Sequence, residues 1–149
     1  MKRIISPTFG QVLADNSEGR VDVAGNAFKV ESKVFAEYLA RRAHANQRER
    51  FGGAPYVEHL ARIAAAVDGD DAKTVAWLHD IVEDTPITLA ALRVLFSPRV
   101  AGAVGFLTRK SEFESYNAYI ATIARVNIPV VTAVKVADLR DHLRPDGPA

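Results

Sequence analysis

Hydrophobic residues recur every three or four positions along most of the chain beyond residue 31, which is the spacing of one face of an α-helix. Hydroxyl side chains mark where several of these helices begin. Ser32, Thr88 and Ser97 each precede an apolar stretch and can act as N-caps. Ser111 and Glu114 have the spacing of a capping box, which predicts a further helix start. The pattern therefore predicts a succession of helices.

The expected helices carry apolar stripes that suit packing around a common core. The first stripe consists of Val34, Phe35, Tyr38 and Leu39. The β-branched run at 130–137 is different, because by propensity alone it also fits a buried strand. Periodicity by itself leaves the structure of that run open.

The N-terminal residues 1–30 show a weaker pattern. Val21 and Val23 alternate with polar neighbours, Gly25-Asn26 offers a turn, and Phe28 resumes the apolar alternation. This favours a short N-terminal arm or β-hairpin, with a loosely ordered tail as the alternative. An arm of this kind also suits contact with a partner or with a second copy of the chain.

Composition narrows the classes of function. The chain has 149 residues, a formal net charge of +1 and no cysteine. The small charge argues against a broad footprint for nucleic acid or a membrane surface, and no apolar run reaches the roughly 18 residues of a membrane span. We therefore expect a single cytoplasmic domain, with metal sites built from histidine and carboxylate side chains. The oligomeric state stays open, a homo-oligomer included.

The segment 77–84 concentrates ionisable residues among apolar ones. His79, Asp80, Glu83 and Asp84 occur within six positions. On one continuous helix, His79 and Glu83 would lie one turn apart, as would Asp80 and Asp84, with most of the remaining surface buried. A buried Asp80 needs an ion-pair partner or a cation, and the adjacent imidazole and carboxylate suit a divalent metal. The alternative is a solvated acidic helix end with His79 hydrogen-bonded in the core.

A basic segment follows the expected first helix. Arg48 and Arg50 lead into Gly52-Gly53. A basic helix end with a glycine loop can bind phosphate or stack on a base. Cations that complement the dipole of a solvated helix end explain the same residues.

Three motifs occur in a fixed order along the chain. They are Pro55-Tyr56-Val57-Glu58-His59, then Trp77-Leu78-His79-Asp80-Ile81-Val82-Glu83-Asp84-Thr85, then Val134-Lys135-Val136-Ala137-Asp138-Leu139-Arg140-Asp141-His142-Leu143. Together they resemble the HD superfamily of metal-dependent phosphohydrolases, and within it the RelA/SpoT-type alarmone hydrolases. A lone His-Asp pair would be a weak signal, whereas the three motifs in this order are specific.

This resemblance implies an all-α fold, an HD-domain helical bundle over residues 31–149, in which the β-branched run belongs to a helix. It also implies that His59, His79, Asp80 and Asp138 bind one divalent ion, usually Mn²⁺ in these hydrolases. Two imidazoles and two carboxylates suit Mn²⁺ and leave coordination positions for water and a substrate oxygen.

The resemblance further implies that Glu83 and Asp84 act on the reaction rather than on the metal. The reaction in the family is hydrolysis of the 3′-pyrophosphate of guanosine tetra- or pentaphosphate. A carboxylate beside a metal-activated water can take its proton.

Substrate contacts are implied at four positions. Arg48, or Arg50 in view of the loop length, lies where the family contacts the guanine base. Lys135 precedes Asp138 by three residues and can meet a phosphate. His142 stands where the family usually has an asparagine that contacts the nucleotide, so recognition is expected to differ there.

We expect a small, stand-alone hydrolase of a guanosine polyphosphate, because the chain ends soon after the third motif and leaves no room for a synthetase domain. A nucleotidase or pyrophosphatase acting on other nucleotides would use the same metal site. The alternative from another class is a regulatory module that binds a nucleotide or a partner protein without turnover. Such a module would have no need of Glu83 and Asp84.

Overall fold

The computed structural model describes residues 20–21, 27–28, 31–49, 53–111 and 113–144, and these residues are mostly helical. The helices are α2 (Ser32–Ala43), α3 (Tyr56–Ala66), α4 (Asp70–Leu78), α5 (Ile81–Asp84), α6 (Leu89–Leu95), α7 (Pro98–Leu107), α8 (Tyr116–Val126) and α9 (Pro129–His142). The predicted all-α helical fold is confirmed. None of the helices in the described part of the chain is long and apolar enough to cross a membrane.

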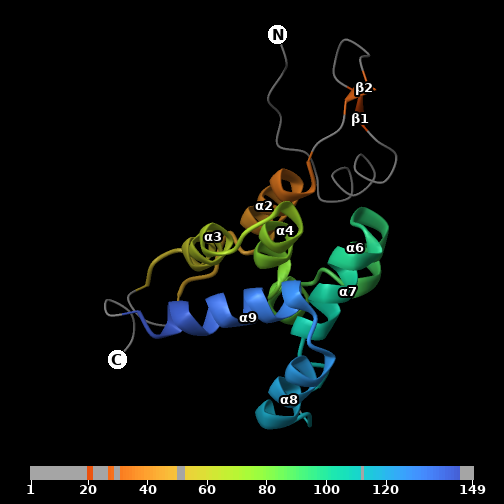
Figure 1. The fold of residues 1–149 in the computed structure, drawn as a ribbon. Coiled ribbons are helices and arrows are strands. Elements are labelled where there is room, and N and C mark those ends of the chain that lie inside the picture. The colour runs from red at the N-terminus through yellow and green to blue at the C-terminus, as the bar shows by residue number, and fades with distance from the viewer. Residues whose placement is uncertain (1–19, 22–26, 29–30, 50–52, 112, 145–149) are drawn as a thin grey trace.

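Helix α4 is the centre of the bundle. It contacts α2, α3, α7 and α9, and in the view of Figure 1 α9 runs below α3 and across the lower end of α4. Leu39, Leu60, Leu78, Val104 and Val134, from five different helices, are completely buried in the shared core. The segments that carry the three motifs therefore pack against one another, although they are far apart in the sequence.

The β-branched run at 130–137 lies within α9, so it is a helix, as the family resemblance implied. Asn127 ends α8 in the left-handed conformation with φ 49°, and Pro129 opens α9, where its missing N–H removes no helical hydrogen bond. Val131 and Val134 are fully buried and Asp138 nearly so, which places them on one face of α9. Burial of this face outweighs the modest preference of β-branched residues for strands.

Two of the predicted N-caps are confirmed. Thr88 accepts a hydrogen bond from the backbone N–H of Ala91 at the start of α6, and Ser97 accepts one from Val100 at the start of α7. Each cap satisfies a backbone donor that the first helical turn leaves free.

The other two predicted helix starts are wrong. Ser32 is already the first residue of α2, whose N-cap is Glu31, with no side-chain capping bond. Helix α8 is capped by Ser115, which accepts from the N–H of Ala118, so the capping box of Ser111 and Glu114 does not form. Ser111 instead closes a short turn in the loop before that helix.

The apolar stripe predicted for α2 is shifted by one position. Val34 and Tyr38 are 52% and 36% exposed. The buried face consists of Phe35, Ala36, Leu39 and Ala40. The small side chains of Ala36 and Ala40 let α2 lie close against α4. These alanines are therefore buried, whereas the larger apolar residues Val34 and Tyr38 are not.

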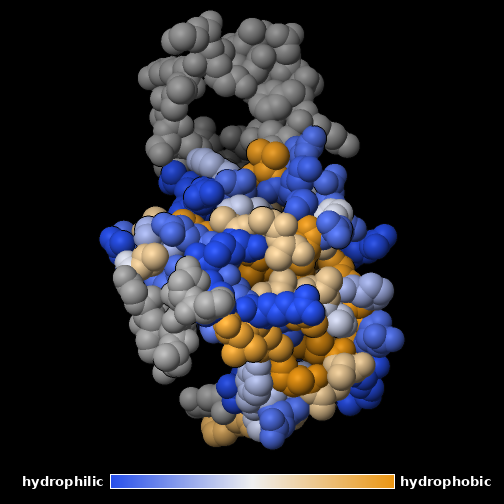
Figure 2. All heavy atoms as spheres, turned by 60° about the vertical axis from the view of Figure 1, so that its left-hand side comes forward, coloured by the Kyte–Doolittle hydropathy of each residue, from blue (hydrophilic) through white to orange (hydrophobic). Residues whose placement is uncertain are grey.

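Apolar side chains also reach the surface of the helical body, where Figure 2 shows them gathered among hydrophilic residues on one face. The exposed apolar residues include Val136 and Leu139 on α9 and Leu143 directly after it.

Near the N-terminus, β1 (Arg20–Val21) pairs antiparallel with β2 (Ala27–Phe28). Arg20 lies opposite Phe28 and Val21 opposite Ala27. This pairing agrees with the predicted β-hairpin, whose expected turn at 25–26 lies outside the described residues.

Candidate metal centre

The helix predicted over 77–84 is interrupted at His79 and Asp80. Helix α4 ends at Leu78, and α5 begins at Ile81. Asp80 has φ −104° and ψ 0°, in the bridge region where regular helix cannot continue. The prediction of one continuous helix is therefore wrong at these two residues. The break allows their side chains to face one space, with His79 Nε2 only 3.1 Å from Asp80 Oδ2.

His79 presents an electron-rich nitrogen to the interior. Its Nδ1 lies 2.8 Å from the carbonyl oxygen of Ala76 and donates to it, so neutral His79 has a lone pair on Nε2. This buried Nε2 makes no directed hydrogen bond within the described residues, and it lies 3.7 Å from Asp138 Oδ1 as well as near Asp80. Either a second proton on Nε2 or a metal cation must offset the repulsion between the Nε2 lone pair and the carboxylates of Asp80 and Asp138. Burial opposes protonation, but the charge of Asp80 outweighs it and raises the pKa of His79 well above its usual value.

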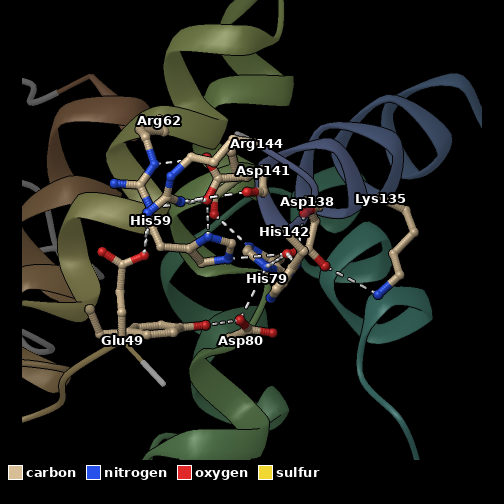
Figure 3. Close-up of polar contacts among 12 residues, drawn as sticks. Glu49, His59, Arg62, His79, Asp80, Lys135, Asp138, Asp141, His142 and Arg144 are labelled. Carbon is tan, nitrogen blue, oxygen red and sulfur yellow. Dashed lines mark hydrogen bonds and ion pairs between the residues drawn. The ribbon is translucent and has the colours of Figure 1, made fainter. Parts of the chain in front are cut away.

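His59 of α3 is buried and has carboxylates at both ring nitrogens. Nδ1 lies 2.7 Å from Asp141 Oδ2, and Nε2 lies 3.1 Å from Asp138 Oδ1. The ring centroids of His59 and His79 are 6.0 Å apart. Figure 3 shows His59 between Asp141 on one side and Asp138 with His79 on the other. With its proton on Nδ1, His59 directs the Nε2 lone pair into the same space as His79.

The carboxylates of Asp80 and Asp138 are both held in the ionised form. Burial would raise the pKa of Asp80, but the positive charge of a protonated His79 beside it outweighs burial and lowers that pKa to about 2. The Tyr56 hydroxyl also donates to Asp80. Burial opposes ionisation of Asp138 too, yet the hydrogen bond with His59 and the neighbouring charge of His79 hold its pKa well below the usual range. The cluster therefore combines two ionised carboxylates with two imidazoles in a largely buried space, which suits a cation in place of the imidazole protons.

The structure brings the four sequence-predicted ligand residues together. One ligand atom each from His59, His79 and Asp80 lie within 4.8 Å of one another, and Asp138 Oδ1 approaches both imidazoles. Ligand atoms of His59, Asp138 and His142 also lie within 4.8 Å of one another. Two imidazole nitrogens with two carboxylates form a donor set of intermediate softness, which fits a divalent transition ion.

Glu83 and Asp84 lie at the end of α5, on exposed positions next to the cluster. The backbone N–H of Arg109 donates to Glu83 Oε1. Partial burial of its carboxylate and the charges of Asp80 and Asp84 raise the pKa of Glu83, against the effect of that hydrogen bond. Burial and the charge of Asp80 likewise raise the pKa of Asp84. A carboxylate with a raised pKa beside a cation site is suited to proton transfer.

Two of the predicted substrate-binding residues border the cluster. Lys135 Nζ lies 3.2 Å from Asp138 Oδ2 and 5.1 Å from the ring centroid of Tyr119. His142 has a 60% exposed side chain, and its Nδ1 lies 2.9 Å from the carbonyl oxygen of Asp138. Its ring centroid is 5.0 Å from that of His59. Lys135 and His142 thus lie on either side of Asp138, and His142 is open to solvent.

Arg48 lies further out, on an exposed position where its guanidinium donates to the carbonyl oxygen of Gly53 at 3.2 Å. Its backbone bridges to Pro55, directly before Tyr56, which connects this loop to the wall of the cluster. Arg50 lies outside the described residues.

Sequence reasoning assigned no role to Tyr56 or Asp141, although both contact the cluster. Each precedes or follows a predicted ligand by three residues, Tyr56 before His59 and Asp141 after Asp138. On a helix that spacing puts both side chains on one face, which was the available signal.

Comparison with known proteins agrees with this geometry. No protein-family model matches the chain. A probable guanosine-3′,5′-bis(diphosphate) 3′-pyrophosphohydrolase of Synechocystis is 32% identical over an alignment of 115 residues, and the alignment covers 68% of this chain and 15% of the relative. A probable GTP pyrophosphokinase of Mycobacterium leprae is 32% identical over an alignment of 156 positions, gaps included, which covers 94% of this chain and 18% of the relative. A solved structure of a metazoan SpoT orthologue that hydrolyses ppGpp matches with a TM-score of 0.67 and 25% identity, over 78% of this chain and 71% of that one.

The chain spans less than a fifth of the length of these two relatives, so it corresponds to one region of each. The structural match, in contrast, extends over most of both chains. Sequence similarity and fold agree with each other, and both support the resemblance of this chain to the HD-type ppGpp 3′-pyrophosphohydrolases.

Proposed function

We propose that this chain is a metal-dependent hydrolase that releases pyrophosphate from the 3′ position of guanosine 3′,5′-bis(diphosphate) (ppGpp). One observation carries the proposal: a buried His/Asp cluster that suits a cation has two carboxylates of raised pKa at its edge. The names of several relatives and of the structural neighbour point to the same substrate.

In this proposal His59, His79, Asp80 and Asp138 hold one divalent ion, which we take to be Mn²⁺. When bound, such an ion acts as a Lewis acid that lowers the pKa of a water molecule and offsets negative charge on phosphate oxygens. Two of the four side chains are already oriented for this, His79 by the carbonyl oxygen of Ala76 and Asp80 by the Tyr56 hydroxyl.

Glu83 is the proposed general base and Asp84 its companion. The oxygen of a water molecule forms a bond to the phosphorus next to O3′ of the ribose, the bond from that phosphorus to O3′ breaks, and Glu83 takes the proton of the water. The leaving O3′ then gains a proton from solvent or from an acid nearby. The N–H of Arg109 holds Glu83 in position, and a raised pKa makes Glu83 a better proton acceptor.

For recognition, we propose that Lys135 and His142 contact the phosphate or ribose groups and that Arg48 or Arg50 contacts the base. Lys135 and His142 lie on the border of the cluster, whereas Arg48 lies on an exposed loop that leads into it. The division into an arm over 1–30 and a domain over 31–149, the cytoplasmic location, the lack of a nucleic-acid ligand and the oligomeric state stay predictions from the sequence.

A panel of nucleotides tests this function. Purified protein is incubated with ppGpp, nucleoside triphosphates and nucleoside monophosphates, with and without Mn²⁺, and the released pyrophosphate and orthophosphate are quantified separately. We expect pyrophosphate and GDP from ppGpp, only when Mn²⁺ is present.

Other results would identify the alternatives. Orthophosphate from a nucleoside monophosphate would indicate a nucleotidase, and pyrophosphate from a nucleoside triphosphate would indicate a pyrophosphatase with another substrate. Binding of ppGpp without turnover at any Mn²⁺ concentration would indicate a regulatory binding module.

Replacing Arg48 by alanine is expected to raise KM for ppGpp about tenfold, equivalent to about 1.4 kcal/mol, with a smaller change in kcat. A planar guanidinium on the loop can stack on a base with equal strength in the ground state and the transition state. Steady-state kinetics measure the effect. Arg93→Ala, which removes an exposed arginine from α6, is the matched control. Unchanged kinetics in Arg48→Ala would remove Arg48 from the substrate site.

A further inference from the structure

A network of charged side chains lies on the side of His59 away from the proposed cation. Asp141 Oδ2 lies 2.7 Å from His59 Nδ1, and the two side chains are only 9% and 5% exposed. Asp141 is itself held by Arg62, which donates from Nε to Oδ1 at 2.7 Å and from Nη2 to Oδ2 at 3.0 Å. Such a two-point contact between guanidinium and carboxylate fixes orientation as well as charge.

We propose that Asp141 is a positioning residue for the metal centre, which holds the His59 imidazole so that Nε2 faces the cation. The proposal rests on the metal site of the proposed function. A carboxylate that accepts the second N–H of a metal-binding histidine fixes both the tautomer and the ring orientation, and it makes the ligand nitrogen more basic. Asp141 can do this for His59 as the Ala76 carbonyl does for His79.

The arrangement follows from helical spacing on two packed helices. His59 and Arg62 are three residues apart on α3, and Asp138 and Asp141 are three residues apart on α9. Each pair therefore lies on one helix face. Where α3 packs against α9, Asp138 contacts Nε2 of the His59 imidazole and Asp141 contacts Nδ1. One turn of α9 therefore contacts both ring nitrogens.

Asp141 does not act as a metal ligand in this arrangement. Glu49, His59 and Asp141 lie close enough together to bind an ion. Arg62 and Arg144 already occupy the space between them: Arg62 Nη2 lies 2.5 Å from Glu49 Oε1, and Arg144 Nη1 lies 2.9 Å from Asp141 Oδ2. Two guanidinium groups take the place that a cation would need, and both oxygens of Asp141 are engaged. The carboxylate is thus directed at the histidine and not at the metal.

The test is the affinity of the metal-free protein for Mn²⁺, measured by calorimetric titration of wild type, Asp141→Asn and the control Asp68→Asn. Asparagine keeps the size of the Asp141 side chain but replaces one carboxylate oxygen by an NH₂ group. That group is a donor, so it cannot accept the hydrogen bond from Arg62 or from His59. We expect the dissociation constant for Mn²⁺ to rise about 10- to 100-fold in Asp141→Asn. Asp68 is exposed, and both Asp68 and Asp141 line a surface pocket between α3 and α9, so Asp68→Asn should bind Mn²⁺ like wild type.

A second variant and a stability measurement separate positioning from folding. Arg62→Lys keeps the positive charge but loses the two-point contact, so a smaller rise in the same dissociation constant is expected. Unfolding temperatures of the metal-free proteins are recorded alongside. An Asp141→Asn variant that unfolds earlier but binds Mn²⁺ with wild-type affinity would show a structural role only and overturn the inference, as would a wild type that binds no Mn²⁺. Failure of wild type to hydrolyse ppGpp while it binds Mn²⁺ would remove the proposed function and leave this inference standing.

Discussion

Asp80→Ala is expected to lose bound metal and turnover together. Asp80 supplies one carboxylate of the cluster, and its Oδ2 lies 3.1 Å from the electron-rich Nε2 of His79. Its pKa of about 2 keeps that carboxylate charged at any ordinary pH. Without it the site loses a ligand and much of the negative charge that attracts a cation. Metal per chain, measured by elemental analysis, should fall from about one ion to a small fraction, and turnover should fall by more than the ~10²-fold expected for loss of a general base.

The folded state of this variant needs its own control, because Asp80 also accepts a hydrogen bond from Tyr56. Circular dichroism and the unfolding temperature of metal-free Asp80→Ala and of the closer substitution Asp80→Asn report on folding. A folded Asp80→Ala that keeps a full complement of metal would show that Asp80 is not a ligand.

Glu83→Gln is expected to keep the fold and the metal and to lose most of the turnover. Glu83 occupies an exposed position at the end of α5, one short turn beyond Asp80, where it can border a substrate without binding the ion. Glutamine keeps the oxygen that accepts from the Arg109 N–H but cannot take a proton. A residue that transfers a proton in the transition state contributes on the order of 10²–10⁴-fold, so kcat should fall by at least ~10²-fold.

Metal content and a matched substitution complete this experiment. Glu58→Gln removes another exposed glutamate, in the first turn of α3, and should leave kcat unchanged. Near-normal turnover in Glu83→Gln, with metal confirmed, would falsify the role of Glu83 as base. Loss of metal in that variant would instead make Glu83 a ligand and reopen the assignments of His59 and Asp138.

Local sequence signals predicted the helix starts of α6 and α7, where the N-cap side chain bonds within the first turn of its own helix. Thr88 and Ser97 each bond to an N–H three residues ahead, which the sequence shows directly. Ser111 failed because Ser115 offers the same chemistry four positions later. In addition, the loop before α8 is held by the contact between Arg109 and Glu83, twenty-six residues apart.

The site residues were predictable by type, whereas their geometry was not. The motifs named His59, His79, Asp80 and Asp138, and the structure brings them together. The break after Leu78 has no proline or glycine to announce it, so a continuous helix was the natural expectation from local pattern. The break depends on tertiary structure, since His79 and Asp80, which lie between the two helices, both contribute side chains to the cluster.

The role proposed for Asp141 was hidden for a related reason. Its contact with His59 joins residues 82 positions apart, and nothing in the sequence between them sets how α3 and α9 pack. The sequence showed only that Asp141 follows Asp138 by three residues and so shares its helix face. Its partners become evident once the two helix faces are seen together.

Crystals of the wild-type protein grown with Mn²⁺ test the central claim most directly. Diffraction data collected on either side of the manganese absorption edge locate the ion without any assumption about its ligands. We predict one anomalous peak per chain, bounded by His59, His79, Asp80 and Asp138, with Glu83 outside the coordination shell. No peak in this cluster at a saturating Mn²⁺ concentration, or a peak at another site alone, would contradict the account.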